Sequence, residues 1–136
     1  MVKGSILGSA VSGSAEAEGA GIYANGSIQK LTIFGDVSRA NIIAGVAPGV
    51  DGRFGDLVDE DDTTGGASTI STISKLVIKG TITGSFSVTD YYGIEANKII
   101  SVQIGTAKYK DTDPTLNFAT GVQLAISEDV LLREVN

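Results

Sequence analysis

The chain contains neither cysteine nor histidine, and these absences remove several classes of chemistry. Without cysteine there is no disulfide framework and no thiolate metal site. Without histidine there is no Ser/His/Asp or Cys/His nucleophilic system and no imidazole metal ligand. Paired carboxylates are the catalytic groups that remain.

Long apolar segments are also lacking. No apolar run approaches the ~20 residues that span a bilayer, so we expect no membrane insertion. No signal peptide is visible, because the first four residues lead directly into a Gly/Ser/Ala-rich body. Since the repeat pattern starts almost at residue 1, we expect the chain to be a piece of a longer protein.

Positive charge is scarce, and negative charge is concentrated in one segment. The net charge is −6, from 16 acidic and 10 basic residues. Residues 51–62 hold six of the acids against Arg53 alone, and the remainder is nearly neutral. The sequence shows no basic stripe that would replace phosphate counterions, so it predicts no nucleic-acid partner. Anionic membrane is disfavoured for the same reason.

Glycine is abundant and proline is scarce. The 136 residues include 18 glycines and 2 prolines, and 42% of the residues are apolar. This length and composition predict a single globular domain, residues 1–136. The glycine content favours short strands joined by tight turns over helices.

Two segments of the chain recur. Residues 21–25 (Gly-Ile-Tyr-Ala-Asn) return at 93–97 (Gly-Ile-Glu-Ala-Asn), and residues 27–37 return at 72–82. A unit that recurs in so short a chain is expected to stack on copies of itself. The two offsets differ, so an insertion or an extra coil lies between the copies. We place a long acidic loop insertion at about 47–68.

Apolar residues alternate within the repeats. Leu31, Ile33 and Val37 would face one way and Thr32 and Phe34 the other, and the pattern returns at 76–82, 99–104 and 122–126. This predicts an all-β solenoid in which Leu31 and Leu76 point inward from neighbouring strands of the same direction. The alternative is an antiparallel β-sandwich, which is less favoured because Asn-Gly and Asp-Gly each occur once.

The C-terminal segment, about residues 127–136, is expected to cap the stack, because a terminal coil would otherwise expose its edge. Ser127 could begin a short helix there. Val130 and Leu132 could equally form a last strand.

Residues 28–37, 74–85 and 93–99 carry the patterns I-x-K-L-x-I-x-G-x-(V/I) and G-I-x-A. Over roughly residues 4–126 the chain resembles the repeats of very large secreted or surface-attached bacterial proteins. That resemblance implies a right-handed parallel β-helix, a secreted or cell-surface location, and a spacer, adhesive or carbohydrate-facing role. The calcium-binding nonapeptide G-G-x-G-x-D-x-U-x is not present.

The acidic segment is the candidate metal site. Calcium takes 6–8 oxygen ligands, which carboxylates and backbone carbonyls can supply. The candidate ligands are Asp51, Asp56, Asp59, Glu60, Asp61 and Asp62. Their spacing differs from that of an EF-hand, and the alternative is a solvated loop that keeps the chain soluble.

Carboxylates elsewhere could form a pair that cuts glycosidic bonds, as in other β-helices by analogy of fold. The candidates are Asp36, Asp90 and Glu95. Tyr91 and Tyr92 lie between the last two in sequence, and the alternative is a turn in which these tyrosines cover a corner.

Asn25 and Asn97 occupy equivalent places in the repeat. Asparagine tolerates the left-handed conformation, and stacked asparagines can form hydrogen-bonded ladders. We therefore predict that both are corner residues.

Together these features predict a non-catalytic structural or interaction module of an extracellular bacterial protein. The alternatives are a polysaccharide-active enzyme and a calcium-binding adhesive module. The expected partner is a polysaccharide or a protein, and copies of the chain could associate by end or side stacking. No cofactor other than calcium is implied.

Overall fold

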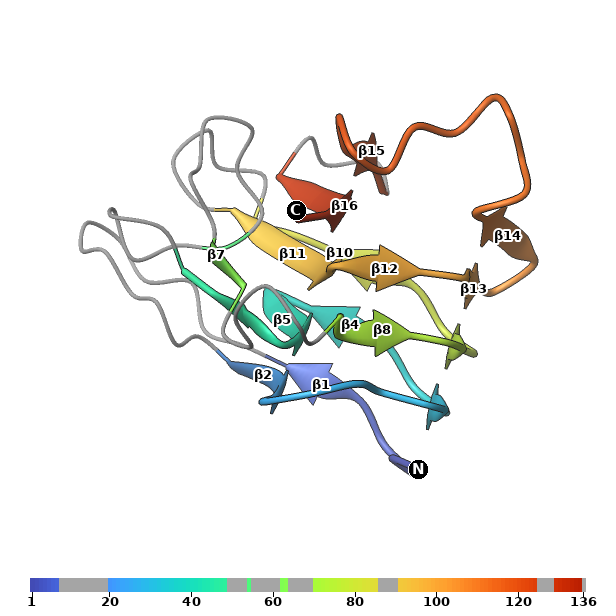
Figure 1. Cartoon of the computed structure of the whole chain (residues 1–136). Coiled ribbons are helices and arrows are strands. Elements are labelled where there is room, and N and C mark those ends of the chain that lie inside the picture. The colour runs from blue at the N-terminus through green and yellow to red at the C-terminus, as the bar shows by residue number, and fades with distance from the viewer. Residues whose placement is uncertain are drawn as a thin grey trace.

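The computed structural model describes residues 1–7, 20–48, 54, 62–63, 70–85, 91–124 and 129–135. Every regular element within these ranges is a strand, which confirms the prediction of an all-β chain (Figure 1). In the same ranges no helix of the length and apolarity needed to cross a bilayer occurs.

The strands form four sheets with parallel pairing and one separate antiparallel pair. Sheet A contains β3 (Leu31–Ile33), β9 (Leu76–Ile78), β13 (Ser101–Ile104) and β14 (Ala107–Lys110). Sheet B contains β1 (Ile6–Leu7), β4 (Val37–Ser38) and β10 (Ile82–Thr83). Sheet C contains β2 (Ala20–Ala24), β5 (Ala40–Ala44), β11 (Tyr92–Ala96), β16 (Val130–Glu134) and β15 (Val122–Gln123). Sheet D contains β8 (Thr72–Ile73) and β12 (Lys98–Ile99), and the separate pair is β6 (Val46–Ala47) with β7 (Asp62–Thr63).

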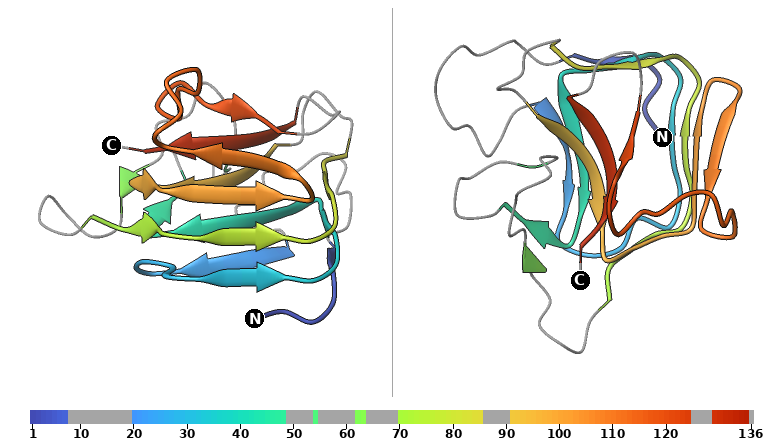
Figure 2. Two further views of the ribbon diagram at one scale, coloured as in Figure 1. Left: turned by 90° about the vertical axis from the view of Figure 1, so that its right-hand side faces the viewer. Right: turned by 90° about the horizontal axis from the view of Figure 1, so that it is seen from above.

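Successive passes of the chain visit the sheets in the same order. One pass runs β3, β4, β5, β8, and the next runs β9, β10, β11, β12. Strands from successive passes pair in parallel, so each pass lies directly on the one before (Figure 2). Antiparallel pairing is confined, among the described strands, to β14, β15 and the β6–β7 pair. A sandwich of antiparallel hairpins therefore does not describe these sheets.

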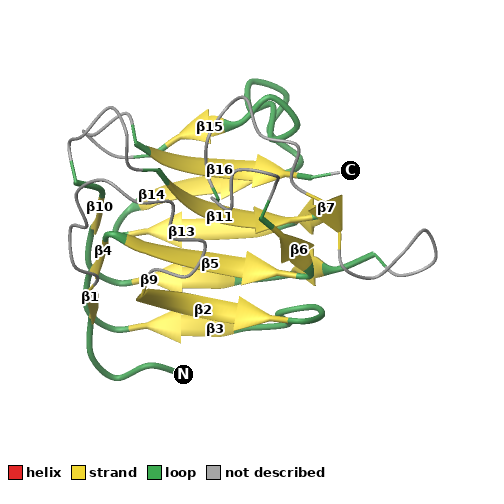
Figure 3. Ribbon diagram, turned by 90° about the vertical axis from the view of Figure 1, so that its left-hand side faces the viewer, coloured by secondary structure: helices red, strands yellow, loops and turns green. Residues whose placement is uncertain are grey.

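The sequence repeats correspond to structural neighbours. Residues 27–37 lie beside 72–82, with Leu31 paired to Leu76 and Val37 to Ile82. The other motif is two passes apart, because β5 lies between β2 and β11 (Figure 3). The two repeats are therefore separated by different numbers of residues for two reasons. One is the extra pass that contains β5, and the other is the segment between β5 and β8 (residues 45–71), which we call the excursion.

The main apolar core lies on the inner side of the sheets. Strand geometry puts alternate side chains on opposite faces, and the predicted inward residues are buried as expected, Leu31 being 8% and Leu76 0% exposed. Val77 was expected to face solvent but is also buried, on the outer side of β9 between its register partners Thr32 and Gln103. The fully buried apolar residues of this core include Ile33, Val37, Ile42, Ile73, Leu76, Ile78, Ile94, Ile99, Val102, Leu124 and Leu132.

Glycines stack at the corner between sheets A and B. The Gly35 amide donates to the Gly4 carbonyl (3.0 Å), and the Gly80 amide donates to the Gly35 carbonyl (3.2 Å). A Cβ at Gly80 would lie 2.7 Å from the Gly35 carbonyl oxygen. The passes approach too closely here for any side chain, which explains why the motif repeats glycine at this place.

Asn97 lies at a corner, between β11 and β12. Its Oδ1 accepts from the Ser71 amide (3.0 Å) and its Nδ2 donates to the Val135 carbonyl (2.9 Å), so it links three passes. Asn97 does not use the left-handed conformation that asparagine tolerates, because Arg39 (φ 51°) is the one described non-glycine residue with positive φ. Asn25 and Asn97 do not stack directly on each other. Ala24 and Ala96 both pair with Ala44 of the intervening strand β5, so Gly45 occupies the position between the two asparagines.

The C-terminal alternatives are resolved in favour of a strand. Val130–Glu134 forms β16 and pairs in parallel with β11, so the prediction of a helix is wrong for these residues. Within the predicted loop insertion at about 47–68, most residues lie outside the described ranges; where they are described, Val46 and Ala47 of β6 pair with Thr63 and Asp62 of β7.

Candidate interaction face

The predicted calcium ligands lie outside the described residues. Asp62 is described only through its backbone, in β7, and the other five are not described. In the part of the chain that is described, no three acidic side chains group as metal ligands would. Calcium binding by the loop stays a prediction, which a melting-temperature titration with calcium checks, since a ligand of the native state raises that temperature.

Asp36 connects three passes at the corner between sheets A and B. Its amide donates to Ser5 Oγ (3.0 Å), and its Oδ1 accepts from both the amide (2.7 Å) and the hydroxyl (3.0 Å) of Thr81. The hydrogen bond from the Thr81 amide, together with that from its hydroxyl, lowers the pKa of Asp36 below its usual value. The carboxylate is therefore committed to holding the corner.

Glu95 lies on a different wall, the outer face of sheet C, and is 0% exposed. Its Oε1 lies 3.7 Å from Nε of Arg133, which is itself buried. The structure does not bring Asp36 and Glu95 together, and Asp90 lies outside the described residues. Tyr92 packs in the main core rather than over an exposed corner.

Two described residues of the segment that follows β5, Val46 and Phe54, pack on the outer face of sheet C. Ile43 forms a small apolar cluster with Val46, Phe54 and Val135, and the Phe54 ring lies 5.8 Å from that of Tyr23. Asn41 is also buried there, where its Oδ1 accepts from the Gly93 amide (2.8 Å). Charged and polar groups on this wall are thus enclosed by the protein itself.

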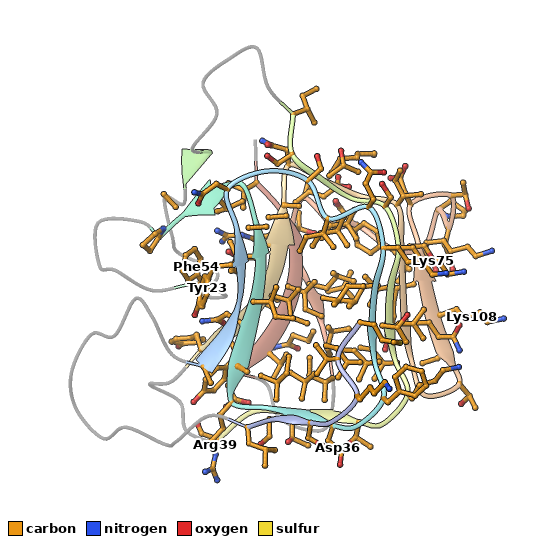
Figure 4. All side chains as sticks on the ribbon, turned by 90° about the horizontal axis from the view of Figure 1, so that it is seen from below. Tyr23, Asp36, Arg39, Phe54, Lys75 and Lys108 are labelled. Carbon is orange, nitrogen blue, oxygen red and sulfur yellow. The ribbon has the colours of Figure 1, made fainter. Side chains whose placement is uncertain are left out.

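The outer face of sheet A is different, because lysines gather on it. We call it the lysine face, and define it by Lys3, Lys30, Lys75, Lys79, Lys108 and Lys110, which are all exposed. Figure 4 shows Lys75 and Lys108 projecting from one side of the stack, with Tyr23 and Phe54 on the opposite side. Every lysine of the chain except Lys98 belongs to this face.

Register places these side chains in three columns that run across the passes. One column contains Lys30, Lys75, Ser101 and Lys110, and the middle one contains Thr32, Val77, Gln103 and Lys108. The third contains Lys3, Phe34 and Lys79. Each directly follows one of the residues Val2, Ile33 and Ile78, which lie beside one another on successive rungs. Neighbouring rungs are about 4.8 Å apart, so lysines distant in sequence become neighbours.

None of the six lysines forms an ion pair with another described residue. Lys98 on sheet D contrasts with them, because its Nζ lies 2.9 Å from Asp111 and 3.6 Å from Glu134. The hydrogen bond to Asp111 and the charge of Glu134 raise the pKa of Lys98. The positive charge of the lysine face is therefore available to a partner, whereas that of Lys98 is engaged.

The lysine face is not evident along the sequence, and the prediction that the chain has no basic stripe is wrong for the folded protein. Lys30 and Lys75 are 45 residues apart, yet their neighbours Leu31 and Leu76 are paired. The available signal was the lysine that precedes leucine in both copies of the repeat. The folded chain has a basic surface, so the absence of a nucleic-acid partner stays a prediction.

Comparison of the chain with protein-family models, with curated proteins and with solved structures gives no match. The geometry of the described residues is therefore the basis for assigning a function.

Proposed function

We propose that the chain is a non-catalytic structural or interaction module of an extracellular bacterial protein, built as a right-handed parallel β-helix. The observation that supports the proposal is the in-register parallel pairing of successive passes through the same sequence of sheets. Such stacking produces regular walls whose side chains are held at fixed spacing. A rigid wall of this kind suits binding or spacing and requires no moving part.

The lysine face supports the interaction role within this proposal. Six exposed ammonium groups on one wall create a local positive potential on a chain whose net charge is negative. Neither Asp36 nor Glu95 is placed to serve as half of a glycosidase pair with the other, because each holds its own structural partners.

The experiment that tests the proposal measures binding and cleavage together. The protein is incubated with a panel of neutral and acidic polysaccharides, and both retention of the protein and release of reducing ends are followed. We expect retention by at least one polymer without release of reducing ends. Catalytic release would support the alternative of a polysaccharide-active enzyme, and retention by none of the polymers would overturn a polysaccharide-binding role.

End stacking of copies belongs to the same proposal. Val2, Ile6, Ile22 and Ile28 of the first pass pack against the core but stay partly exposed, and the stack begins with β1, β2 and β3, which are edge strands of their sheets. An uncovered strand edge is a template for pairing with another chain. Light scattering coupled to gel filtration checks whether copies associate, and an Ile22→Lys variant should weaken association that uses this end.

A further inference from the structure

We infer that the lysine face binds an acidic polysaccharide, a linear polymer of sugars that carry carboxylate groups, with Phe34 as the platform for a sugar ring. The inference rests on the proposed interaction role and names the ligand class. Its first support is charge complementarity, because lysines are spread over four rungs of one wall and no acidic side chain belongs to the three columns.

The spacing of the lysines suits a polymer that carries regularly repeated charges. Lys30 and Lys75 lie on adjacent rungs, about 4.8 Å apart along the stack, and Lys3 and Lys79 lie two rungs apart, about 10 Å. A linear polyanion can therefore meet several ammonium groups at once. Each exposed contact is weak by itself, so binding depends on the number of contacts made together.

Phe34 supplies an apolar element in the middle of one lysine column. Its side chain is 51% exposed, and Lys3 and Lys79 stand on the rungs to either side. The face of an aromatic ring is electronegative and attracts the C–H groups of a sugar. A sugar stacked on Phe34 would place the carboxylates of its neighbours beside the flanking lysines.

The remaining side chains of the face also suit a sugar more than a nucleic acid. Ser101 lies in the first column, and Thr32 and Gln103 lie in the middle one. Their side chains can form hydrogen bonds with the hydroxyl groups of a sugar. The cations of the face are lysines, which attract carboxylate and phosphate alike as point charges, so the choice between a sugar and a nucleic acid rests on the uncharged side chains. Single-stranded nucleic acid is usually bound by several aromatic residues, but Phe34 is the one exposed aromatic side chain of the three columns.

The test measures the affinity of the full chain for polygalacturonate by isothermal titration calorimetry. The same backbone with its carboxylates methyl-esterified is the uncharged control, and poly(dT) and polyglutamate are the competing polyanions. We expect binding to polygalacturonate that weakens by about tenfold when the salt rises from about 20 mM to about 200 mM, since exposed charges are screened. Esterified polymer should bind much more weakly.

Variants locate the site on the molecule. Lys3→Gln/Lys79→Gln and Lys30→Gln/Lys75→Gln should each weaken binding by about fivefold, and Phe34→Ala by about threefold. The matched control is Arg39→Gln/Lys98→Gln, which removes the same charge from other walls and should change affinity by less than about twofold. Thermal melts establish that each variant is folded.

The inference is overturned if polygalacturonate does not bind at low salt, if the esterified polymer binds equally well, or if the control variant loses as much affinity as the face variants. Tighter binding of poly(dT) would replace the polysaccharide by nucleic acid, and tighter binding of polyglutamate would replace it by an acidic polypeptide. In those two cases, or if a neutral polysaccharide binds instead, the interaction role stands and only the ligand class fails. Release of reducing ends would count against the interaction role itself.

Discussion

The outer faces of sheets A and C carry charge in opposite ways. On sheet A the lysines stand in solvent, and none forms an ion pair with a described residue. On sheet C Glu95 and Arg133 are buried next to each other, and Val46 and Phe54 pack with Ile43 on the same face. The charged side chains are therefore exposed to solvent on the outer face of sheet A and buried on that of sheet C.

This difference separates charge that serves stability from charge that is free for binding. A buried ion pair has lost its hydration, so removing one partner leaves an uncompensated charge in the protein. An exposed lysine keeps its hydration, and its loss changes stability little. Substitutions on the two walls should thus affect different measurements, stability for sheet C and binding for sheet A.

The largest effect is expected from Arg133→Met, which removes the buried cation that lies 3.7 Å from the Glu95 carboxylate. We expect the free energy of unfolding in urea to fall by about 3–5 kcal/mol. The matched substitution on the other wall, Lys75→Met, should change it by less than about 0.5 kcal/mol.

A double variant tests the cause of that loss. Glu95→Leu/Arg133→Met removes both charges and should regain most of the stability, because an apolar pair of similar volume replaces the ion pair. Equal losses for Arg133→Met and Lys75→Met would contradict the contrast between the walls.

Truncating an apolar residue should also cost more stability on the outer face of sheet C than on that of sheet A. Ile43→Ala removes a side chain that is buried between sheet C and the excursion, and should cost about 2–4 kcal/mol. Phe34→Ala on sheet A should cost less than about 1 kcal/mol, because its ring is half exposed. A cost at Phe34 equal to that at Ile43 would show that a further segment covers the lysine face.

The sequence predicted the inner side of the stack better than its outer side. The alternation of Leu31, Ile33 and Val37 and the copy at Leu76, Ile78 and Ile82 gave the inward residues and their register, because burial on one face imposes a period of two. An extra coil was one of the two explanations for the different offsets, but strand β5 is not recognisable in the sequence, because Ala-Asn-Ile-Ile-Ala lacks the initial glycine of the repeat.

The two outer walls depend on contacts that periodicity does not encode. Alternation assigns Glu95 and Lys75 alike to the outside, yet Glu95 is buried and Lys75 is exposed, a difference that periodicity does not encode. The lysine face requires the register between passes, which joins residues 45 apart in sequence.

Two glycines, one at a corner of the stack and one in an open turn, should differ by a smaller amount in their effect on the free energy of unfolding. Gly80 lies where sheets A and B meet, and a Cβ there would clash with Asp36 and with the Gly35 backbone. Gly26, in the turn after β2, has open space around it. Gly80→Ala should lower the free energy of unfolding by about 1–3 kcal/mol. Gly26→Ala should leave it unchanged or raise it slightly, so a similar loss at both positions would remove close approach as the reason for the glycine column.

The smallest effect is expected at Asp36, and it should depend on pH. Because hydrogen bonds from Thr81 lower the pKa of Asp36 in the folded state, the carboxylate stabilises the fold above its ordinary pKa of about 3.9. That stabilisation is lost as the pH falls through the lower, folded-state value. Asp36→Asn should therefore melt below the unsubstituted chain at pH 7, and the two melting temperatures should converge near pH 2.

Asp113 provides the control for this titration. Its pKa is also lowered, but by Thr115 within the same turn, whereas Asp36 bonds a strand pass 45 residues away. Asp113→Asn should change the melting temperature at pH 7 less than Asp36→Asn does, because a local turn orders few residues and a corner bond joins two passes. If the order is reversed, the corner hydrogen bonds of Asp36 contribute nothing to holding the passes together, and the glycine column alone must explain the close approach of sheets A and B.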